Sequence, residues 1–164
     1  MTSRPRRAFN FEVRSYRADD YASLLHMYDC FTPKARFQGM PPRDGEERKR
    51  WISMLVKKGE SFLAWEQAKV IGHVVLLPDF KKGDAEYLIF VNQAHRGCGV
   101  GTELTRAALR RAAELGLRTV WLTVDAYNFR ATRLYRKFGF QFCDTYRSES
   151  ERMMTYNCGS NNGT

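Results

Sequence analysis

The stretch HRGCGVGTEL, residues 95 to 104, places three glycines within five positions and follows them directly with residues that favour a helix. Glycine adopts backbone conformations that other residues avoid, and it lets another group approach the backbone closely. A glycine-rich turn that leads from a strand into a helix presents backbone N–H groups at the positive end of the helix dipole. The stretch therefore predicts a turn that binds an anion, most simply a phosphate group.

Two common phosphate-binding motifs do not fit this turn. Residues 97 to 104 read GCGVGTEL, which is neither the dinucleotide fingerprint G-x-G-x-x-G nor a Walker motif with its G-K-[ST] ending. The surrounding charge still favours an anionic partner. From Arg96 to Phe140 there are nine basic residues and three acidic ones, so +6 of the chain's net charge of +9 lies in this region.

The hydrophobic periodicity predicts a mixed α/β domain with the element order βααβββαβαββ. The expected strands are residues 11–17, 61–67, 69–79, 85–92, 118–126, 140–148 and 151–157, and the expected helices are residues 18–31, 45–58, 101–115 and 128–139. Trp51, Met54 and Leu55 are expected to point inward from the second helix, which a capping box at Asp44 and Glu47 begins. The nearly continuous apolar run at 118–126 predicts a strand buried on both faces, paired in parallel with the strand before the glycine turn.

Length and composition predict one domain over residues 11–157, after a flexible basic tail at 1–10 and before a disordered tail at 158–164. The apolar runs are too short to span a bilayer, and no export signal follows the N-terminal arginines, so we expect a cytoplasmic protein without a membrane partner. The four cysteines form no CxxC pair and the histidines have no metal-ligand spacing, which predicts neither disulfides nor a metal site. A homodimer is left open.

Two motifs together resemble one known superfamily. From Arg96 the turn reads R-x-x-G-x-G after a strand, and about 30 residues later residues 128 to 140 read NFRATRLYRKFGF. Both match the motifs of the GNAT superfamily of acetyl-CoA-dependent N-acetyltransferases. Residues 13–37 are also similar to the opening of GNAT domains in bacterial protein lysine acetyltransferases. The resemblance implies the GNAT fold, in which a central mixed sheet is splayed between its fourth and fifth strands and carries helices on both faces.

The resemblance also implies which residues bind acetyl-CoA. The turn would hold the pyrophosphate, because a Cβ at Gly99 or Gly101 would keep a phosphate away, while the edge of the fourth strand would pair with the pantetheine arm. Asn128 would bond the pantetheine, and the N–H of Val91 would stabilise the oxyanion. The full set of implied cofactor-binding residues is Ile89, Phe90, Val91, Arg96, Gly97, Cys98, Gly99, Val100, Gly101, Thr102, Asn128, Ala131 and Tyr135.

Two residues are candidates for catalysis. A lysine amine has a pKa of about 10.4, so a neutral nucleophile at pH 7 costs about 4.6 kcal/mol unless a base or a desolvating pocket assists. Glu86 lies where many family members place such a base, and Asp79, Asp84 and Tyr87 are its competitors. Tyr135 matches the family's general acid, which protonates the leaving thiolate. Transfer of a proton from an ordinary tyrosine to that thiolate is uphill by about 1.5 pKa units.

The expected function is therefore transfer of an acetyl group from acetyl-CoA to a primary amine in a ternary complex. The acceptor is either a protein lysine or a small-molecule or amino-acid amine. The loop at 31–44, with Phe31, Phe37 and Met40 and few acidic residues, is expected to wall the acceptor site. A non-catalytic acyl-CoA sensor and a nucleic-acid binding module remain as other classes, although no aromatic RNA-binding signature supports the second.

Overall fold

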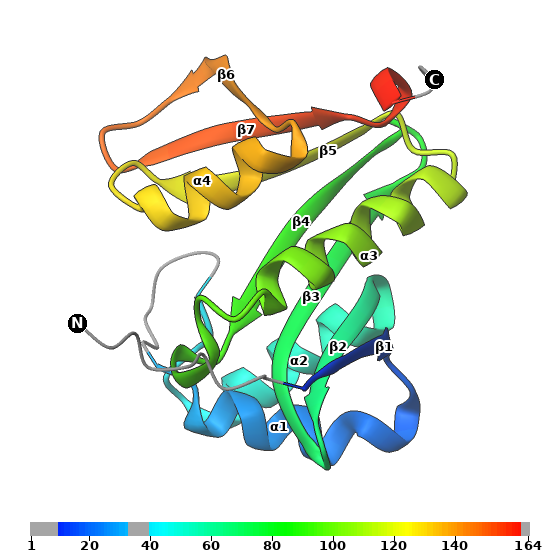
Figure 1. Cartoon of the computed structure of the whole chain (residues 1–164), viewed down its shortest axis with the longest axis vertical. Coiled ribbons are helices and arrows are strands. Elements are labelled where there is room, and N and C mark those ends of the chain that lie inside the picture. Colours follow the sequence, from blue (N-terminus) through cyan, green and yellow to red (C-terminus); the bar gives the residue numbers. More distant parts are fainter. Residues whose placement is uncertain (1–9, 33–39, 162–164) are drawn as a thin grey trace, which may run out of the picture.

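The computed structural model describes residues 10–32 and 40–161, and the predicted element order is confirmed there (Figure 1). The strands are β1 (Glu12–Ser15), β2 (Glu60–Glu66), β3 (Lys69–Asp79), β4 (Asp84–Val91), β5 (Thr119–Asp125), β6 (Gln141–Arg147) and β7 (Glu151–Asn157). The α-helices are α1 (Tyr21–Cys30), α2 (Gly45–Lys58), α3 (Val100–Glu114) and α4 (Phe129–Phe138). Short 3-10 turns are η1 (Ala18–Asp20), η2 (Gln93–His95) and η3 (Cys158–Asn161).

All seven strands form one sheet in the order β1-β2-β3-β4-β5-β7-β6. The pair β4–β5 is parallel, and the other neighbouring pairs in the described sheet are antiparallel. The β4–β5 ladder joins Asp84–Glu86 to Thr119–Trp121 and ends there. Beyond this short ladder the two strands diverge, as Figure 1 shows, so the predicted splay is confirmed.

Helices cover the sheet from both sides and create two hydrophobic cores. The larger core lies under α3 and α4 and contains Ala85 and Tyr87 of β4. The smaller core lies under α1 and α2 and contains Phe90 of β4. Because successive strand residues point to opposite faces, the odd-numbered residues of β4 face α3 and α4, and the even-numbered ones face the other side.

Helix α3 begins and ends at left-handed glycines. Gly99 is its N-cap with φ +88°, and Gly116 follows its last turn with φ +73°. The predicted apolar stripe is buried at Leu104, Ala108 and Ala112. Thr105 is buried as well, because its hydroxyl donates to the Gly101 carbonyl at 2.6 Å and shares a 2.7 Å hydrogen bond with the Tyr87 hydroxyl.

Two predictions about packing were wrong. Strand β5 alternates between buried Val120, Leu122 and Val124 and less buried positions between them, so only one of its faces is fully covered. Trp121 is the only apolar residue at the odd-numbered positions of this strand, and it is half-buried. In α2, Leu55 is buried as predicted and Trp51 packs against the smaller core, but Met54 is only half-buried and Ile52 is the other fully buried side chain.

The predicted tail boundaries need one correction. Residues 158–161 are not a disordered tail, because they form η3, and the Cys158 N–H donates to the Arg118 carbonyl at 2.9 Å. The rest of that tail, residues 162–164, and the N-terminal residues 1–9 lie outside the described residues.

Candidate functional site

The divergence of β4 from β5 leaves main-chain groups of β4 directed toward the opening. The Asn92 N–H donates to the Ile71 carbonyl at 2.9 Å, which fixes which residues of β4 pair with β3. In an antiparallel ladder every second residue turns its N–H and C=O away from the partner strand. Ile89 and Val91 are therefore the residues whose main-chain groups face the side from which β5 has diverged. Phe90 instead pairs with His73 of β3, and its ring lies in the core under α1 and α2.

The glycine turn lies between η2 and α3, beside this opening (Figure 1). Gly97 and Gly99 both have positive φ, and the N-cap Gly99 brings no side chain to cap the first N–H groups of α3. These N–H groups belong to Val100, Gly101 and Thr102. A Cβ built on Gly99 has nothing within 4 Å, so the turn is open there. The arrangement has the geometry of an anion site at a helix N-terminus.

Gly101 has a different role from the predicted one. A Cβ at this position would lie 3.1 Å from Leu134 of α4 and 4.0 Å from Ile89 of β4. It would therefore point into the protein and not toward a phosphate, so the reason given for this glycine was wrong. Gly101 instead allows the first turn of α3 to lie close to α4.

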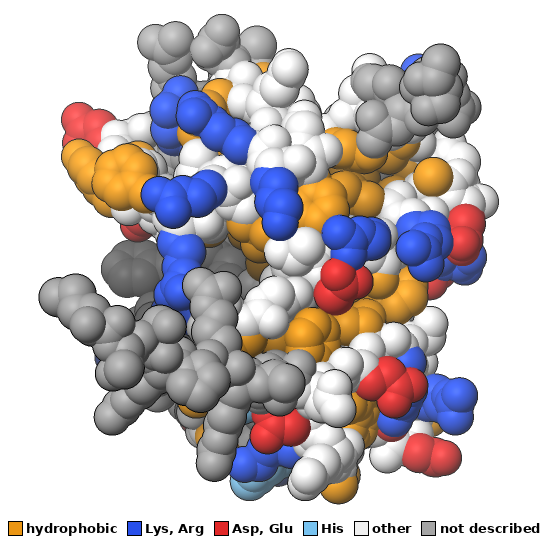
Figure 2. All heavy atoms as spheres, viewed as in Figure 1, with side chains coloured by type: hydrophobic (Ala, Val, Ile, Leu, Met, Phe, Trp, Pro, Cys, Tyr) orange, Lys and Arg blue, Asp and Glu red, His pale blue; other side chains and the backbone are white. Residues whose placement is uncertain are grey.

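Basic side chains gather on the face that carries α3 and α4 (Figure 2). Arg130 of α4 lies directly beside the glycine turn, because its Nη2 is 3.1 Å from the position of a Cβ on Gly97. The sequence showed the charge of this helix but not which arginine reaches the turn. Arg96 and Cys98 are exposed in the turn, and the Cys98 thiol donates to the Arg96 carbonyl at 3.7 Å.

Asn128 and Ala131 are joined at the start of α4. The Asn128 side-chain oxygen accepts a hydrogen bond from the Ala131 N–H at 3.1 Å, so Asn128 is the N-cap, as predicted. This bond occupies the oxygen and leaves the NH₂ group as a donor. Asn128 itself is exposed.

Tyr135 lies in an aromatic cluster under α4. Its ring centroid is 5.7 Å from that of Tyr87 and 5.8 Å from that of Phe140, and it is 7% exposed. Burial raises the pKa of Tyr135 above its ordinary value. Donation of its proton is therefore more uphill than the ordinary tyrosine pKa implied. The competitor Tyr87 is held by its hydrogen bond to Thr105.

Glu86 occupies the last rung before the strands separate, opposite Trp121. It is half-buried, and burial raises the pKa of its carboxyl group. A carboxylate with a raised pKa is a stronger base, as a general base requires. The competitor Asp79 instead accepts hydrogen bonds from the N–H groups of Lys81 and Lys82, at 3.1 and 3.2 Å, in the turn before β4. The competitor Asp84 pairs with Asp79 at the start of the same strand.

The two candidate catalytic residues lie on opposite faces of the sheet. Glu86 belongs to the even-numbered set of β4, whereas Tyr135 packs against the odd-numbered Tyr87. The ladder between β4 and β5 closes the sheet up to Glu86, and the opening begins immediately after it. Any reaction that uses both residues must therefore extend through this opening.

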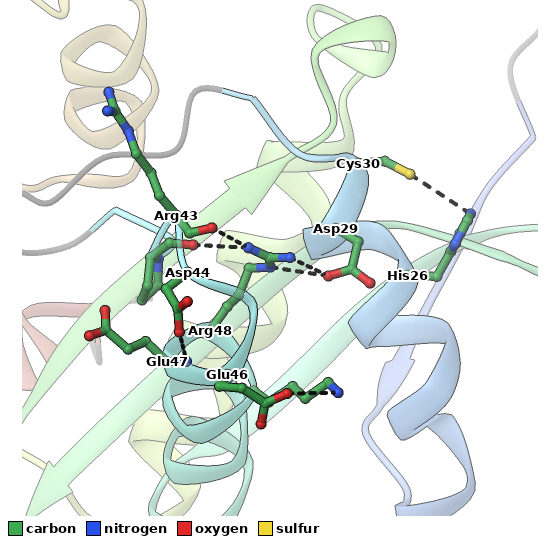
Figure 3. A network of polar contacts seen from close by, with 10 residues as sticks. His26, Asp29, Cys30, Arg43, Asp44, Glu46, Glu47 and Arg48 are labelled. Atoms are coloured by element: carbon green, nitrogen blue, oxygen red, sulfur yellow. Dashed lines mark hydrogen bonds and ion pairs between the residues drawn. The ribbon is translucent and has the colours of Figure 1, made fainter.

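The α1–α2 loop is attached at both of its described ends. Figure 3 shows the Arg48 guanidinium donating to Asp29 of α1 and to the carbonyls of Pro42 and Arg43, at distances from 2.7 to 3.2 Å. At the other end the Gln93 side chain donates to the Thr32 carbonyl at 2.6 Å.

The three loop residues that were expected to wall the acceptor site have different outcomes. Phe31 is not a wall of a site, because it is 6% exposed and packs in the core against Tyr28 and Phe90. Met40 is half-buried, and Phe37 lies outside the described residues.

Other kinds of site find no support in the described part of the chain. No three His, Cys, Asp or Glu side chains among the described residues are grouped as metal ligands. The same residues include no helix with the length and hydropathy needed to cross a membrane. None of the four cysteines, which all lie among the described residues, is in a disulfide bond.

Comparisons with known proteins agree with this geometry. A family model described as "Acetyltransferase (GNAT) family" matches residues 21–140. Over 138 residues the chain is 30% identical to a mycothiol acetyltransferase of Streptomyces scabiei, which covers 80% of this chain and 44% of the relative. Over 137 residues it is 26% identical to an L-methionine sulfoximine/L-methionine sulfone acetyltransferase of Pseudomonas paraeruginosa, which covers 79% of each.

The fold is also similar to that of solved acetyltransferase structures. The yncA protein of Salmonella typhimurium, solved with its cofactor acetyl-CoA, superposes with a TM-score of 0.71 at 16% identity, over 93% of this chain and 96% of that one. This likeness concerns the fold alone. The chain spans less than half the length of the mycothiol acetyltransferases that it matches.

Proposed function

The chain belongs to the acetyltransferase (GNAT) family, and from this membership we propose that it moves an acetyl group from acetyl-CoA to a primary amine by direct transfer in a ternary complex. The observation that carries the proposal is the pairing of two features at one place. An open, glycine-capped helix N-terminus lies beside the point where β4 and β5 diverge. The helix N-terminus suits a diphosphate, and the diverging strand offers an unpaired edge to the linear pantetheine arm of the cofactor.

The cofactor-binding residues follow from this arrangement. The N–H groups of residues 98–102, with Arg96, would hold the pyrophosphate, and Gly97 would let the chain turn there. The main-chain groups of Ile89 and Val91 would pair with the pantetheine arm, with Phe90 fixing the strand between them. Asn128 would donate a hydrogen bond to the arm from its NH₂ group. Ala131, with its small side chain, would leave room for the arm beside the first turn of α4. Arg130 adds a positive charge next to the turn.

Acetyl-CoA supplies an activated thioester, and the residues of this chain would accept and donate the protons that the transfer requires. Glu86 would remove a proton from the acceptor ammonium group, because burial raises the pKa of the carboxyl and makes it a better base. The neutral amine would then attack the carbonyl carbon, with the Val91 N–H donating to the developing oxyanion. The carbon–sulfur bond breaks, and Tyr135 would donate a proton to the leaving thiolate. The nitrogen loses its second proton to solvent, from which the Tyr135 hydroxyl regains the proton it gave, so one proton remains on Glu86.

The acceptor has two candidate classes. A protein lysine is the first, by the likeness of residues 13–37 to protein lysine acetyltransferases. A small-molecule or amino-acid amine is the second, and it is favoured by the names of two relatives, a mycothiol acetyltransferase and an L-methionine sulfoximine/L-methionine sulfone acetyltransferase. A cytoplasmic location stays a prediction.

A two-stage experiment tests the proposal. Thermal unfolding is measured with acetyl-CoA, CoA and longer acyl-CoAs, and thiol release is then screened with amines and lysine peptides. We expect acetyl-CoA and CoA to raise the melting temperature, and at least one amine to release CoA at a rate that depends on enzyme concentration. A cofactor shift without turnover on any amine would instead indicate an acyl-CoA sensor. Salt-sensitive retention on heparin without a CoA effect would indicate nucleic-acid binding.

A further inference from the structure

The sheet has one face that the helices leave partly open. Strands β5 and β7 are in register so that Val120 pairs with Tyr156 and Leu122 with Met154, and these four side chains are buried under α3 and α4. The alternating positions of the same strands therefore point to the opposite side. Helices α1 and α2 pack there against β2 and β3. The positions over β4, β5 and β7 on this side, called the open face below, are Asp84, Glu86, Thr119, Trp121, Thr123, Asp125, Glu151, Met153, Thr155 and Asn157.

The charge of the open face is opposite to that of the whole chain. Its positions include four carboxylates and no lysine or arginine, although the chain carries a net charge of +9. Basic side chains are found on both sides of the sheet, over α3 and α4 on one side (Figure 2) and along α2 on the other. The four carboxylates among the open-face positions favour a cation next to them. An acceptor amine with an ordinary pKa of about 10.4 arrives as a cation.

Trp121 is the aromatic residue of the open face, and it lies at the fork. It pairs with Glu86 in the last rung of the parallel ladder, so both side chains point to the same face from neighbouring strands. The indole is half-buried and β5 is exposed two residues further on, at Thr123. A tryptophan face binds ammonium groups better than any other side-chain ring. The pair thus offers a ring and a carboxylate to one cationic group.

We propose that Trp121 is the acceptor-positioning residue, and that the acceptor is an alkylammonium group that enters from the open face and lies against the indole beside Glu86. This inference rests on the proposed function and narrows it: the acceptor amine is carried on an alkyl stem. The ring accommodates the stem and the charge, and Glu86 takes the proton. Trp121 takes no part in bond making, so it acts on acceptor binding and not on the chemical step.

The test compares two variants at Trp121 and one at another tryptophan. Trp121→Phe keeps an aromatic ring, and Trp121→Leu keeps apolar bulk without a ring. The control, Trp65→Phe, removes a tryptophan from β2 whose ring centroid lies 4.5 Å from the Arg14 Cζ. With the best amine from the screen, Trp121→Leu is expected to raise KM roughly 10-fold with kcat nearly unchanged, and Trp121→Phe to restore most of the loss. Trp65→Phe should behave like the wild type. Equal stabilisation of all variants by CoA confirms that the fold and the cofactor site are intact.

A second measurement does not depend on turnover. Titration with n-butylammonium, with the neutral 1-pentanol as its control, should quench tryptophan fluorescence in the wild type and in Trp65→Phe but not in Trp121→Phe or Trp121→Leu. If the proposed reaction fails on every amine while this quench is present, the acceptor face stands and the enzyme assignment does not. If KM is unchanged in Trp121→Leu, if kcat alone falls, or if the quench persists without Trp121, the inference is overturned.

Discussion

The left-handed glycine at the start of α3 gives the sharpest test of the cofactor site. Gly99 has φ +88°, and a Cβ there meets no atom within 4 Å. Gly99→Ala therefore costs the folded protein only the left-handed conformation, about 1–2 kcal/mol. For a chain of this length that lowers the melting temperature by roughly 2–8 °C. The added methyl group would occupy the open space in which we place the diphosphate.

The same helix supplies a matched control at its other end. Gly116 has φ +73° and again nothing within 4 Å of a built Cβ, but it lies far along the chain from the turn. Gly116→Ala should lower the melting temperature by an amount similar to Gly99→Ala. The two variants thus share the conformational penalty and differ only in their distance from the proposed phosphate.

Cofactor affinity separates the two variants. Loss of one or two charge-assisted hydrogen bonds to a phosphate, at about 1.5–3 kcal/mol, weakens CoA binding by roughly 10- to 100-fold. We expect this loss in Gly99→Ala and wild-type affinity in Gly116→Ala, measured by isothermal titration with CoA. Dephosphorylated pantetheine, which lacks the diphosphate, should not distinguish them. Equal CoA affinities in the two variants would refute the assignment of the turn as the diphosphate site.

Three other predictions concern titratable groups. Glu86→Gln should reduce kcat roughly 100-fold or more at neutral pH. Burial raises the pKa of Glu86 in the folded protein, so the stability that Glu86 contributes declines as pH rises through that pKa. Glu86→Gln should therefore be more stable than the wild type above the ordinary glutamate range but not below it, as melting temperatures across pH will show. Tyr135→Phe should lower kcat by roughly 100-fold while CoA affinity stays constant, and unchanged turnover would remove Tyr135 as the acid. Burial lowers the pKa of His73, whose ring is hydrogen-bonded to Tyr28 and Ser61 at 2.6 and 2.9 Å, to about 3. The stability of the folded protein should therefore fall as the pH drops from about 6.5 towards 3, and the stability of His73→Gln should depend less on pH over that window.

Local patterns carried much of the prediction, because they depend on residues near one another in sequence. The glycines at 97, 99 and 116, the caps at Asp44 and Asn128 and the stripe of α3 are each decided within one or two turns of chain. Left-handed turns need glycine, and a cap needs a short polar side chain, whatever the rest of the fold does. The element order and the position of the left-handed glycine turn could therefore be predicted from the sequence.

Apolar character alone does not predict which side of an element is packed. The run at β5 does not say which face is covered, and the stripe of α2 does not say whether Met54 or Ile52 points inward. Gly101 illustrates the same limit, since its reason is Leu134, which lies 33 residues away in sequence. A pattern within one element does not specify its neighbours.

Patterns within single segments were enough to predict the elements and the glycine turn, and the family motifs pointed to Glu86 and Tyr135. The folded sheet shows in addition that β4 parts from β5 directly after Glu86, that Trp121 lies beside it, and that Tyr135 lies on the opposite face. The reason is that the register of β4 on β5 arises from pairing between segments more than 30 residues apart. Side chains from such segments meet only when the whole sheet forms, so their shared site belongs to the fold and not to any one motif.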